Sequence, residues 1–346
     1  MERYEVIVVG AGPGGLASAR ILAAGGCRVL VLERGRDIGA KVCAGGVTWD
    51  GLIQRVPDSL FEAVFSRQDV CTPWQQVVVH EKNPMVATVD RRRLGRWMAE
   101  QAVTAGAELR SGCTVTALED GVLTVRGEGG SSQRFACDHL IGADGSASLV
   151  RRRLGLASRR MGVGVQVQVP RHFSRMEWHL DPRLFGSGYA WVFPHRDTAS
   201  VGAYGLRTAI EPAALRASLL QWAFDRNLDL TGGVVRAALV NCDYQGHRFG
   251  NTWLVGDAAG LASGLTGEGI FPALLSGEAV AEAILGSRRS DEASGRLTRL
   301  LRRQRLHHRL QDRACQGGTA ARLLLEGLVL LLRLRLLRFS TLEMAA

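Results

Sequence analysis

Three glycines near the start of the chain have the spacing of a loop that binds pyrophosphate. They are Gly10, Gly12 and Gly15, in the run Gly10-Ala11-Gly12-Pro13-Gly14-Gly15. In such a loop the first glycine makes a tight turn, the second lets the backbone approach the phosphates, and the third lets a helix pack closely on a strand. Glu33 stands where an acid accepts hydrogen bonds from the ribose hydroxyls of an adenosine. The pattern predicts a dinucleotide site.

The segments around this loop must form a strand, a helix and a second strand. Glu5 to Val9 is short, apolar and β-branched, which is typical of a buried strand and not of a targeting segment. Leu16 to Ala24 has helical composition, and Val29 to Leu32 predicts a second buried strand that ends at Glu33. The glycine loop therefore lies at a helix N-terminus, whose free N–H groups attract phosphate. This complete context favours a binding loop over a structural turn.

The composition is that of a folded protein with room for two domains. Of 346 residues, 46% are hydrophobic and 22% are charged, which excludes intrinsic disorder. The 42 glycines lack a period of three, which excludes collagen, so they must serve turns and close backbone approaches. The length exceeds that of a usual single domain and suggests two interleaved domains.

The charge balance is basic, with Lys and Arg 43 against Asp and Glu 33 and a net charge of +10. Lys41 and Lys82 are the only lysines, so nearly all of the positive charge is arginine. This excess fits either a coding bias or attraction to anions such as phosphates and lipid headgroups. Aromatic residues make up 6% and do not alternate with basic ones as in a single-strand-binding surface, so no nucleic acid partner is expected.

The seven cysteines predict neither a disulfide framework nor a zinc site. Their number is odd, and no two of them have the spacing CxxC. No metal is therefore expected. With no secretory signal at the start and no disulfide framework, we expect a cytoplasmic location, with association at a membrane surface as an open option.

Two further segments join a buried strand to a turn that contains Gly and Asp. Asp138 to Gly142 runs into Asp144, and Thr252 to Val255 runs into Gly256-Asp257. After the second turn, the segment from Gly267 opens a long helix of small residues that is expected to reach Leu285. Both turns are expected to lie at strand ends, as the first glycine loop does.

Other elements between these turns follow from local periodicity. An amphipathic helix is predicted over residues 89–102. Strands are predicted over 123–125 and 134–136, joined by a glycine-rich hairpin at 128–132. Residues 163–169 alternate Val with Gly and Gln, which is typical of a half-buried strand.

Together, the three Gly-rich segments resemble the fingerprints of flavoproteins with the para-hydroxybenzoate hydroxylase fold. Within that group the chain most resembles the geranylgeranyl reductase family, through the loop Lys41 to Gly46, the strand Gly188 to Pro194 and the turn Gly267 to Ile270. The resemblance implies an α/β fold (α+β overall), with a Rossmann-like FAD-binding domain, an inserted, mostly antiparallel β-sheet that binds substrate, and a C-terminal helical tail. Ala44 departs from the family's glycine, which is expected to alter the loop because alanine resists a positive φ.

The resemblance implies that FAD is the bound dinucleotide and assigns its contacts. Asp257 would bond the ribityl chain, Arg91 would reach the cofactor from the start of its helix, and Val115 would touch the adenine side. Gly269 and Ile270 would present amides to the pyrimidine edge of the ring, where a helix N-terminus stabilises the anionic reduced flavin. The positions implied to bind FAD are Gly10, Gly12, Pro13, Gly14, Gly15, Glu33, Arg34, Cys43, Ala44, Gly46, Arg91, Val115, Asp144, Gly256, Asp257, Gly267, Gly269 and Ile270.

The inserted sheet is expected to cover the flavin with an apolar wall. Its inward side chains would be Trp178, Tyr189, Trp191 and Phe193, with plain core packing as the alternative for each. The domains that we expect are a discontinuous FAD-binding domain (1–75, 85–160 and 246–290), a substrate-binding sheet domain (161–245 with parts of 70–90) and C-terminal helices (291–346).

Cys43 is the candidate catalytic residue. In the reaction that the resemblance implies, reduced FAD passes a hydride from N5 to a C=C bond of an apolar, isoprenoid-like substrate, and a thiol beside the flavin would protonate the other carbon. The alternatives are that water supplies the proton and that Cys43 only fills space.

Two other functions stay open. One is a monooxygenase that hydroxylates a small aromatic or other apolar molecule through a flavin C4a-hydroperoxide, and the other is a flavin-bound scaffold without turnover. In both the reductase and the monooxygenase, an external donor must supply the electrons, because the sequence has no second G-x-G-x-x-G loop for a nicotinamide domain. The expected reductant is NAD(P)H that binds transiently, or a protein electron donor.

The C-terminal segment is rich in leucine and arginine. Within the leucine-rich stretch from Leu323 to Arg338, the longest uncharged run, Gly327 to Leu332, is far shorter than the roughly 20 residues that span a bilayer. If residues 322–338 form one helix, Arg335 and Arg338 lie nearly opposite Arg333. Packing on the protein, lying in a membrane interface and forming a dimer contact all stay open. The expected partner is an apolar or lipid substrate, and the sequence leaves the oligomeric state open.

Overall fold

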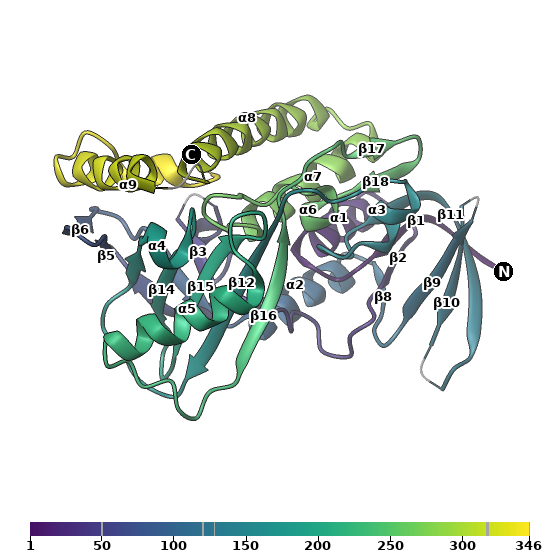
Figure 1. The fold of residues 1–346 in the computed structure, drawn as a ribbon. Coiled ribbons are helices and arrows are strands. Elements are labelled where there is room, and N and C mark those ends of the chain that lie inside the picture. The colour runs from purple at the N-terminus through teal and green to yellow at the C-terminus, as the bar shows by residue number, and fades with distance from the viewer. Residues whose placement is uncertain (50, 120, 128, 316–317, 346) are drawn as a thin grey trace.

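Two large β-sheets with flanking helices lie side by side in the structure (Figure 1). The structure is a computed structural model that describes residues 1–49, 51–119, 121–127, 129–315 and 318–345. One sheet has eight strands and the other has seven. A Rossmann-like unit thus lies beside a mostly antiparallel sheet, which confirms the predicted fold class.

The eight-stranded sheet is built around β1 (Glu2–Val9), which is apolar on both faces. Val6 and Val8 belong to one hydrophobic core, and Ile7 and Val9 belong to the core on the other face. Such two-sided burial is typical of parallel strands covered by helices. The main path of the sheet, in order, is β17 (Arg248–Phe249), β18 (Thr252–Leu254), β11 (Ser132–Gly142), β1, β2 (Val29–Leu32) and β8 (Glu108–Arg110). Two further strands branch from β11: β10 (Val122–Arg126) pairs with it, and β9 (Thr114–Glu119) pairs with β10.

Helices cover both faces of this sheet. α1 (Pro13–Ala24), α2 (Arg91–Thr104) and α7 (Ile270–Leu285) pack on the face of Val6 and Val8, and α3 (Leu149–Arg153) and α6 (Gly256–Ala259) pack on the other. α1 and α7 approach each other closely because small residues meet between them: a Cβ added at Gly277 would lie 2.1 Å from the carbonyl oxygen of Gly14. This contact brings the N-termini of both helices to one side of the sheet.

The seven-stranded sheet supplies the second layer. Its neighbouring strands are antiparallel except for one parallel pair, β13 with β5. α4 (Pro182–Phe185) and α5 (Pro212–Asp225) cover one face, through a core that includes Phe185, Leu219 and Trp222. The strand order of this sheet is β16 (Val235–Asn241), β12 (Met161–Val169), β15 (Ala199–Leu206), β14 (Tyr189–Pro194), β13 (Glu177–His179), β5 (Arg67–Cys71) and β6 (Gln76–His80). A separate small sheet consists of β3 (Gly46–Thr48), β7 (Val86–Val89) and β4 (Phe61–Phe65). The predicted domain boundaries stay a prediction.

Two predictions of local structure were wrong in detail. The helix predicted from residue 89 begins at Arg91, because residues 86–89 pair as β7 and the Asp90 side chain caps the helix by accepting from Arg93 N (2.8 Å). The strand predicted over 134–136 and the one from Asp138 to Gly142 are a single strand, β11, whose residues 132–136 pair with β10 and whose residues 135–142 pair with β1. Glu128, in the predicted hairpin, lies outside the described residues.

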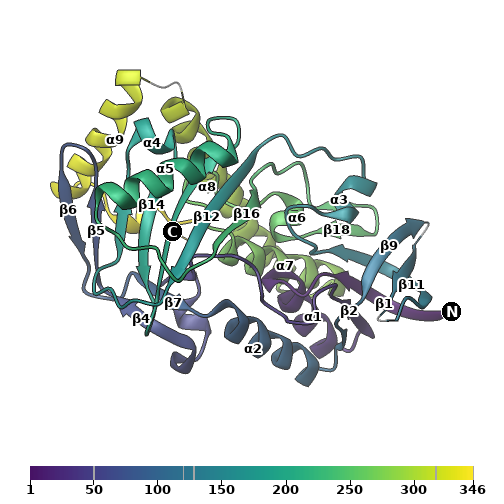
Figure 2. The ribbon, with the colours of Figure 1, turned by 60° about the horizontal axis from the view of Figure 1, so that its bottom comes forward.

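The C-terminal helices pack on the rest of the protein. α8 (Ser290–Cys315) runs along the eight-stranded unit, and α9 (Gly318–Arg333) lies beside β5 and β6 (Figure 2). Glu326 is buried in that contact and accepts from Thr72 Oγ1 (2.7 Å) and Gln75 Nε2 (2.8 Å). Among the helices of the described residues, none combines the length and apolar character that crossing a membrane requires.

The helix in this region ends earlier than the sequence predicts. α9 stops at Arg333, and Arg335 has φ 57°, so the backbone leaves the helical path there. The placement of Arg335 and Arg338 opposite Arg333 on one continuous helix was therefore wrong. A short 3₁₀ helix, Phe339–Leu342, follows.

The close contact of α1 with α7 predicts a specific sensitivity. Gly277→Ala places a methyl group against the Gly14 carbonyl, so we expect the free energy of unfolding to fall by about 1–3 kcal/mol. Urea denaturation measures this change. The matched control is Gly295→Ala in α8, where an added Cβ meets nothing within 4 Å, and stability there should be unchanged or rise by up to about 1 kcal/mol. Equal stability of the two variants would contradict the packing argument.

Candidate functional site

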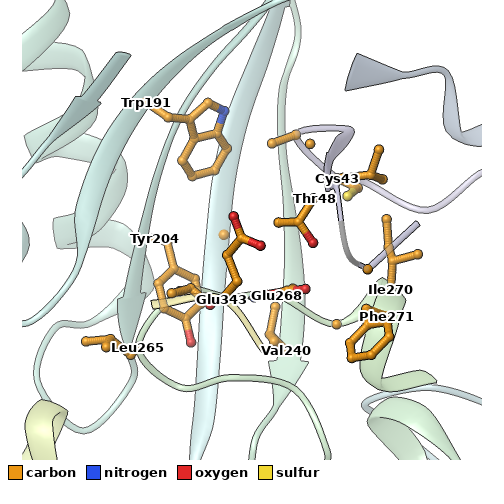
Figure 3. A pocket seen from close by; sticks show the side chains of 18 of the residues that line it. Cys43, Thr48, Trp191, Tyr204, Val240, Leu265, Glu268, Ile270, Phe271 and Glu343 are labelled. Carbon is orange, nitrogen blue, oxygen red and sulfur yellow. Dashed lines mark hydrogen bonds between the residues drawn. The ribbon is translucent and has the colours of Figure 1, made fainter. Parts of the chain in front are cut away.

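A cavity of ≈ 340 Å³ lies where the two large sheets, the Gly10–Gly15 loop and the C-terminal tail meet. Figure 3 shows a close view of its lining, with Trp191 and Tyr204 on one side, Cys43 and Thr48 on another, and Glu268 and Glu343 pointing toward the middle. The cavity runs from the start of α1 to α9, where its wall includes Leu325, Leu328 and Leu332. It joins a polar end built of glycines and charged groups to a long apolar end.

The polar end begins at the predicted pyrophosphate loop. Gly10 has φ 105°, and a Cβ there would lie 2.4 Å from the carbonyl oxygen of Ala143, so only glycine fits this turn. Gly12 is the N-cap of α1 and offers no side chain to satisfy the first amides, and Pro13 opens the helix. Gly12, Pro13 and Gly14 line the cavity. The start of α1 therefore presents free N–H groups and a positive dipole end to it.

Glu33 is held at the edge of this loop. Its carboxylate accepts from Ala11 N at one oxygen and from Gly35 N at the other, each at 2.8 Å. Because a carboxylate offers about four acceptor positions, the ribose contact predicted for Glu33 is compatible with these bonds. Arg34 is exposed beside it, whereas the Val115 side chain is buried in the core, so an adenine contact of Val115 would involve its backbone.

Arg91 provides the most direct sign of an anionic ligand. It is the first residue of α2 and lines the cavity. Its Nε and Nη1 are buried and have no hydrogen-bond partner within the described residues. An unpaired buried guanidinium is costly, so the arrangement is stable when an anion such as a phosphate accepts from it.

The two Gly-Asp turns have different roles in the structure. Asp257 lines the cavity, and its Oδ2 accepts from Lys41 Nζ (2.7 Å) and Ser146 Oγ (2.8 Å). Gly256 precedes it with φ 56°. Asp144 instead faces the start of α3, where its Oδ2 accepts from Leu149 N (2.6 Å), and burial raises the pKa of this carboxyl.

Arg151, which the sequence analysis did not single out, holds Asp257 in place from behind. It is 1% exposed and donates to the carbonyl oxygens of Ala258 (3.2 Å) and Asp243 (2.7 Å). Ala258 is the next residue after Asp257, so Arg151 ties the turn to the neighbouring loop. Its role depends on partners far away in the sequence, and no local motif marks it.

The start of α7 forms the second free helix N-terminus in the cavity. Gly269 is the N-cap, without a side-chain cap, and Gly267, Gly269 and Ile270 line the cavity. Tyr189 Oη donates to Thr266 O (2.5 Å), which fixes the turn from the side of the seven-stranded sheet. This geometry suits the predicted contact of the Gly269 and Ile270 amides with a flavin edge.

Helix α8 supports the preceding loop with buried polar side chains. Gln304 donates to Gly260 O (2.7 Å) and Ala262 O (2.9 Å), and His307 Nδ1 bonds to Ser263 Oγ (2.8 Å). Burial lowers the pKa of His307 to about 4, so this contact involves the neutral ring. The sequence analysis missed these residues because polar side chains in a highly charged helix are usually exposed to solvent.

The cysteine loop is tied to the seven-stranded sheet. The carbonyl oxygen of Cys43 accepts from Gln166 Nε2 (3.2 Å), and that of Ala44 accepts from His195 Nε2 (3.0 Å). The other ring nitrogen of His195 bonds to Glu62. Cys43 Sγ accepts from Gly45 N (3.4 Å) and lines the cavity. His195 and Glu62, which the sequence did not identify, thus position the loop that carries Cys43.

Ala44 does not disturb this loop, contrary to the expectation. The left-handed conformation falls on the next residue, Gly45, with φ 82°, and Ala44 has no positive φ. A Cβ at Gly45 would lie 2.7 Å from the His195 ring, so glycine is required there. Gly46 also lines the cavity, beside Phe193.

The predicted aromatic wall lies together on one side of the cavity. Trp178, Tyr189, Trp191 and Phe193 all line it, with ring centroids 4.8 Å apart for Trp178 and Phe193 and 6.0 Å for Tyr189 and Trp191. Tyr204 is the further member that the sequence analysis missed. Burial raises the pKa of Tyr189, so its hydroxyl stays protonated. The wall is apolar except for the tyrosine hydroxyl and the tryptophan N–H groups of these side chains, which already have hydrogen-bond partners.

Glu268 is a residue with acid chemistry that the sequence analysis left out. It lies in the turn before α7, lines the cavity, and accepts from the backbone amide of Met344 (2.9 Å). Removal from water raises the pKa of Glu268 to about 7, although the Met344 amide and the Thr48 hydroxyl act in the opposite direction. The side chain is thus able to hold and release a proton near neutral pH.

Comparisons with known proteins agree with this geometry. Residues 3–179 match the model of a family described as FAD binding domain. The chain is 30% identical over 84% of its length to a digeranylgeranylglycerophospholipid reductase of Methanopyrus kandleri, covering 83% of that protein. The protein belongs to the geranylgeranyl reductase family of FAD-dependent oxidoreductases.

Two other similarities extend over most of the chain. A geranylgeranyl diphosphate reductase of Rhodobacter capsulatus is 29% identical, over 82% of this chain and 75% of that protein. The crystal structure of a geranylgeranyl bacteriochlorophyll reductase-like protein from Thermoplasma acidophilum superimposes with a TM-score of 0.82 over 96% of this chain and 92% of that one, at 22% identity. The latter shows the shared fold of this reductase family.

The residues of this family member fit FAD. The unpaired guanidinium of Arg91, residues Gly12 to Gly14 of the glycine loop, and two uncapped helix N-termini all face one cavity. Gly12 to Gly14 and Arg91 would hold the phosphates, Asp257 the ribityl chain, and Gly269 with Ile270 the flavin edge. These individual contacts stay predictions.

Arg91 and its neighbour provide a matched test of the cofactor site. We expect Arg91→Met to raise the Kd for FAD by about 10- to 100-fold, because a charge-assisted bond is lost. Titration of the apoprotein by flavin fluorescence measures this. The control is Arg92→Met, on the same helix turn, since Arg92 is exposed and only 3.8 Å from Asp37. Equal affinity of the two variants would exclude Arg91 as a ligand.

Proposed function

We propose that this oxidoreductase reduces C=C bonds in a long isoprenoid chain. The observation that carries the proposal is the continuous apolar lining from the aromatic wall to Leu325, Leu328 and Leu332 of α9. A compact aromatic substrate would not need apolar lining from both the aromatic wall and α9. The similar proteins named above are reductases of digeranylgeranylglycerophospholipid and of geranylgeranyl diphosphate, both of which carry long isoprenoid chains.

The division of work between cofactor and chain follows from the lining. Bound FAD, once reduced, supplies the hydride that adds to one carbon of the double bond. The chain has to orient the alkene, exclude water and deliver a proton to the other carbon. The rings of Trp178, Tyr189, Trp191 and Phe193 provide the apolar surface for the first two tasks.

Glu268 is the group best suited to deliver the proton. A donor must be protonated before the reaction and must regain its proton afterwards, so its pKa should lie near the working pH. Burial raises the pKa of Glu268 to about 7, and its carboxyl faces the cavity. Cys43 lines the same cavity and remains the alternative donor.

The reductant comes from outside the FAD site. We propose that NAD(P)H or a protein donor delivers electrons transiently, since the sequence contains no second G-x-G-x-x-G loop. We expect a charged reductant to approach the polar part of the cavity, which Lys41 and Arg91 line.

The reaction class is tested by product mass. Reduced, FAD-loaded protein is incubated with geranylgeranyl diphosphate and, separately, with a digeranylgeranyl phospholipid, in one series under anaerobic conditions and in a second series with oxygen. We expect a product heavier by two hydrogen atoms for each bond reduced. A product heavier by one oxygen atom, formed only with oxygen, would assign the protein to the monooxygenases and refute the proposal.

The proton donor is tested by substitution and pH. With Glu268→Gln we expect the rate of alkene reduction to fall by about 100-fold or more. In the parent protein the rate should fall as pH rises above about 7, because the carboxyl loses its proton, and the variant should lose this limb. The control is Glu278→Gln, on α7, whose side chain pairs with Arg55 (2.9 Å). If instead Cys43→Ala abolishes reduction and Glu268→Gln does not, the thiol is the donor.

A further inference from the structure

Helix α9 is apolar on two opposite faces. Its inner face lines the cavity through Leu325, Leu328 and Leu332, and Val329 beside them is completely buried. Its other face is open to solvent, at the edge of the molecule in Figure 2. The outer leucine face consists of Leu323 (56% exposed), Leu324 (36%), Leu330 (45%), Leu331 (43%), Leu334 (57%) and Leu336 (74%).

This face is one continuous surface because of the helical period. Leu323 and Leu330 lie on one line along the helix, and Leu324 and Leu331 lie on the next, whereas Leu334 and Leu336 follow the end of α9 at Arg333. Glu326 does not interrupt it, since its side chain turns inward to Thr72 and Gln75. Trp74, 58% exposed in the turn between β5 and β6, is a further exposed apolar side chain beside α9, where its backbone N–H donates to Glu326. Single exposed leucines need no explanation, but six adjacent ones do.

A rim of arginines borders the outer leucine face. Arg333, Arg335 and Arg338 are exposed at its C-terminal end, and Arg322 lies over the Trp74 ring with its guanidinium carbon 4.1 Å from the centroid. The acidic residues after 318 are Glu326 and Glu343, which are 7% and 5% exposed. Within residues 319–345, the exposed charged side chains beside the outer leucine face are therefore all positive.

We propose that the outer leucine face and its arginine rim dock this protein on the surface of an anionic lipid bilayer. Leucine side chains would enter the boundary between headgroups and acyl chains, and the arginines would pair with anionic headgroups. The helix would lie parallel to the surface. A contact between two copies is less favourable, because it would bring together two cationic rims with no exposed acidic side chain on either helix to pair with them.

The docking surface is inferred from exposure and charge alone and does not depend on the proposed reaction. One consequence does rest on the proposed function. Because the inner face of the same helix forms a wall of the cavity, a docked protein would hold the apolar end of that cavity next to the membrane. An isoprenoid chain would then pass from the bilayer along α9 without crossing water.

The test is co-sedimentation of the full, FAD-loaded chain with vesicles of phosphatidylglycerol and phosphatidylcholine. We expect binding to these vesicles and much weaker binding to phosphatidylcholine alone. The pair Leu330→Gln and Leu331→Gln should weaken binding by about tenfold or more. Replacing Arg333, Arg335 and Arg338 by Gln should weaken it on the order of 100-fold on anionic vesicles, and added salt should have a similar effect.

A matched control distinguishes this surface from exposed apolar side chains in general. Leu220 and Phe224 on α5 are 40% and 78% exposed, and replacing both by Gln should leave vesicle binding unchanged. Flavin content and circular dichroism confirm that each variant is folded. Binding that is absent at low salt, or equal in parent and leucine variant, would overturn the proposal. So would a concentration-dependent dimer that the leucine substitutions abolish, because the occupant would then be a second copy. None of these readings requires turnover.

Discussion

The site depends on one close approach, that of α1 to α7. Gly14 and Gly277 let the two helices come so near that a single added methyl group would overlap a carbonyl oxygen. Because the start of α1 packs against α7 within its first turns, both uncapped N-termini open into the same cavity. Two positive dipole ends and the guanidinium of Arg91 then create surroundings that suit an anionic ligand.

The loops that border this cavity are positioned by buried polar contacts from distant parts of the chain. Arg151 secures the turn of Asp257, Gln304 and His307 of α8 secure the loop before α7, and His195 secures the cysteine loop. Each contact satisfies a backbone carbonyl or a side-chain hydroxyl that would be costly to bury alone. A loop fixed in this way keeps its geometry when the ligand leaves, which favours a preformed site.

The C-terminal tail completes the site instead of merely covering the protein. Its helix α9 closes the apolar end of the cavity, and the Met344 amide binds Glu268 beside the start of α7. The same segment thus shapes the space for a substrate and holds the carboxyl that we propose as proton donor. Its exposed face carries the surface that we propose for lipid, so binding of substrate and contact with a membrane would involve one helix.

The sequence by itself determined the elements whose partners are near in the chain. The Gly10–Gly15 loop, Glu33 and the start of α7 could be predicted because a turn and a helix N-terminus depend on local backbone geometry. The aromatic wall was predicted as the inner face of the inserted sheet, and its four side chains do line the cavity. Only the tertiary structure revealed Arg151, His195 and Glu268, whose surroundings come from segments far away in the sequence. The tertiary structure also decided where the leucine-rich tail packs. Because its helix is apolar on two opposite faces, the sequence does not indicate which face is covered. The covered face is the one that meets the cavity.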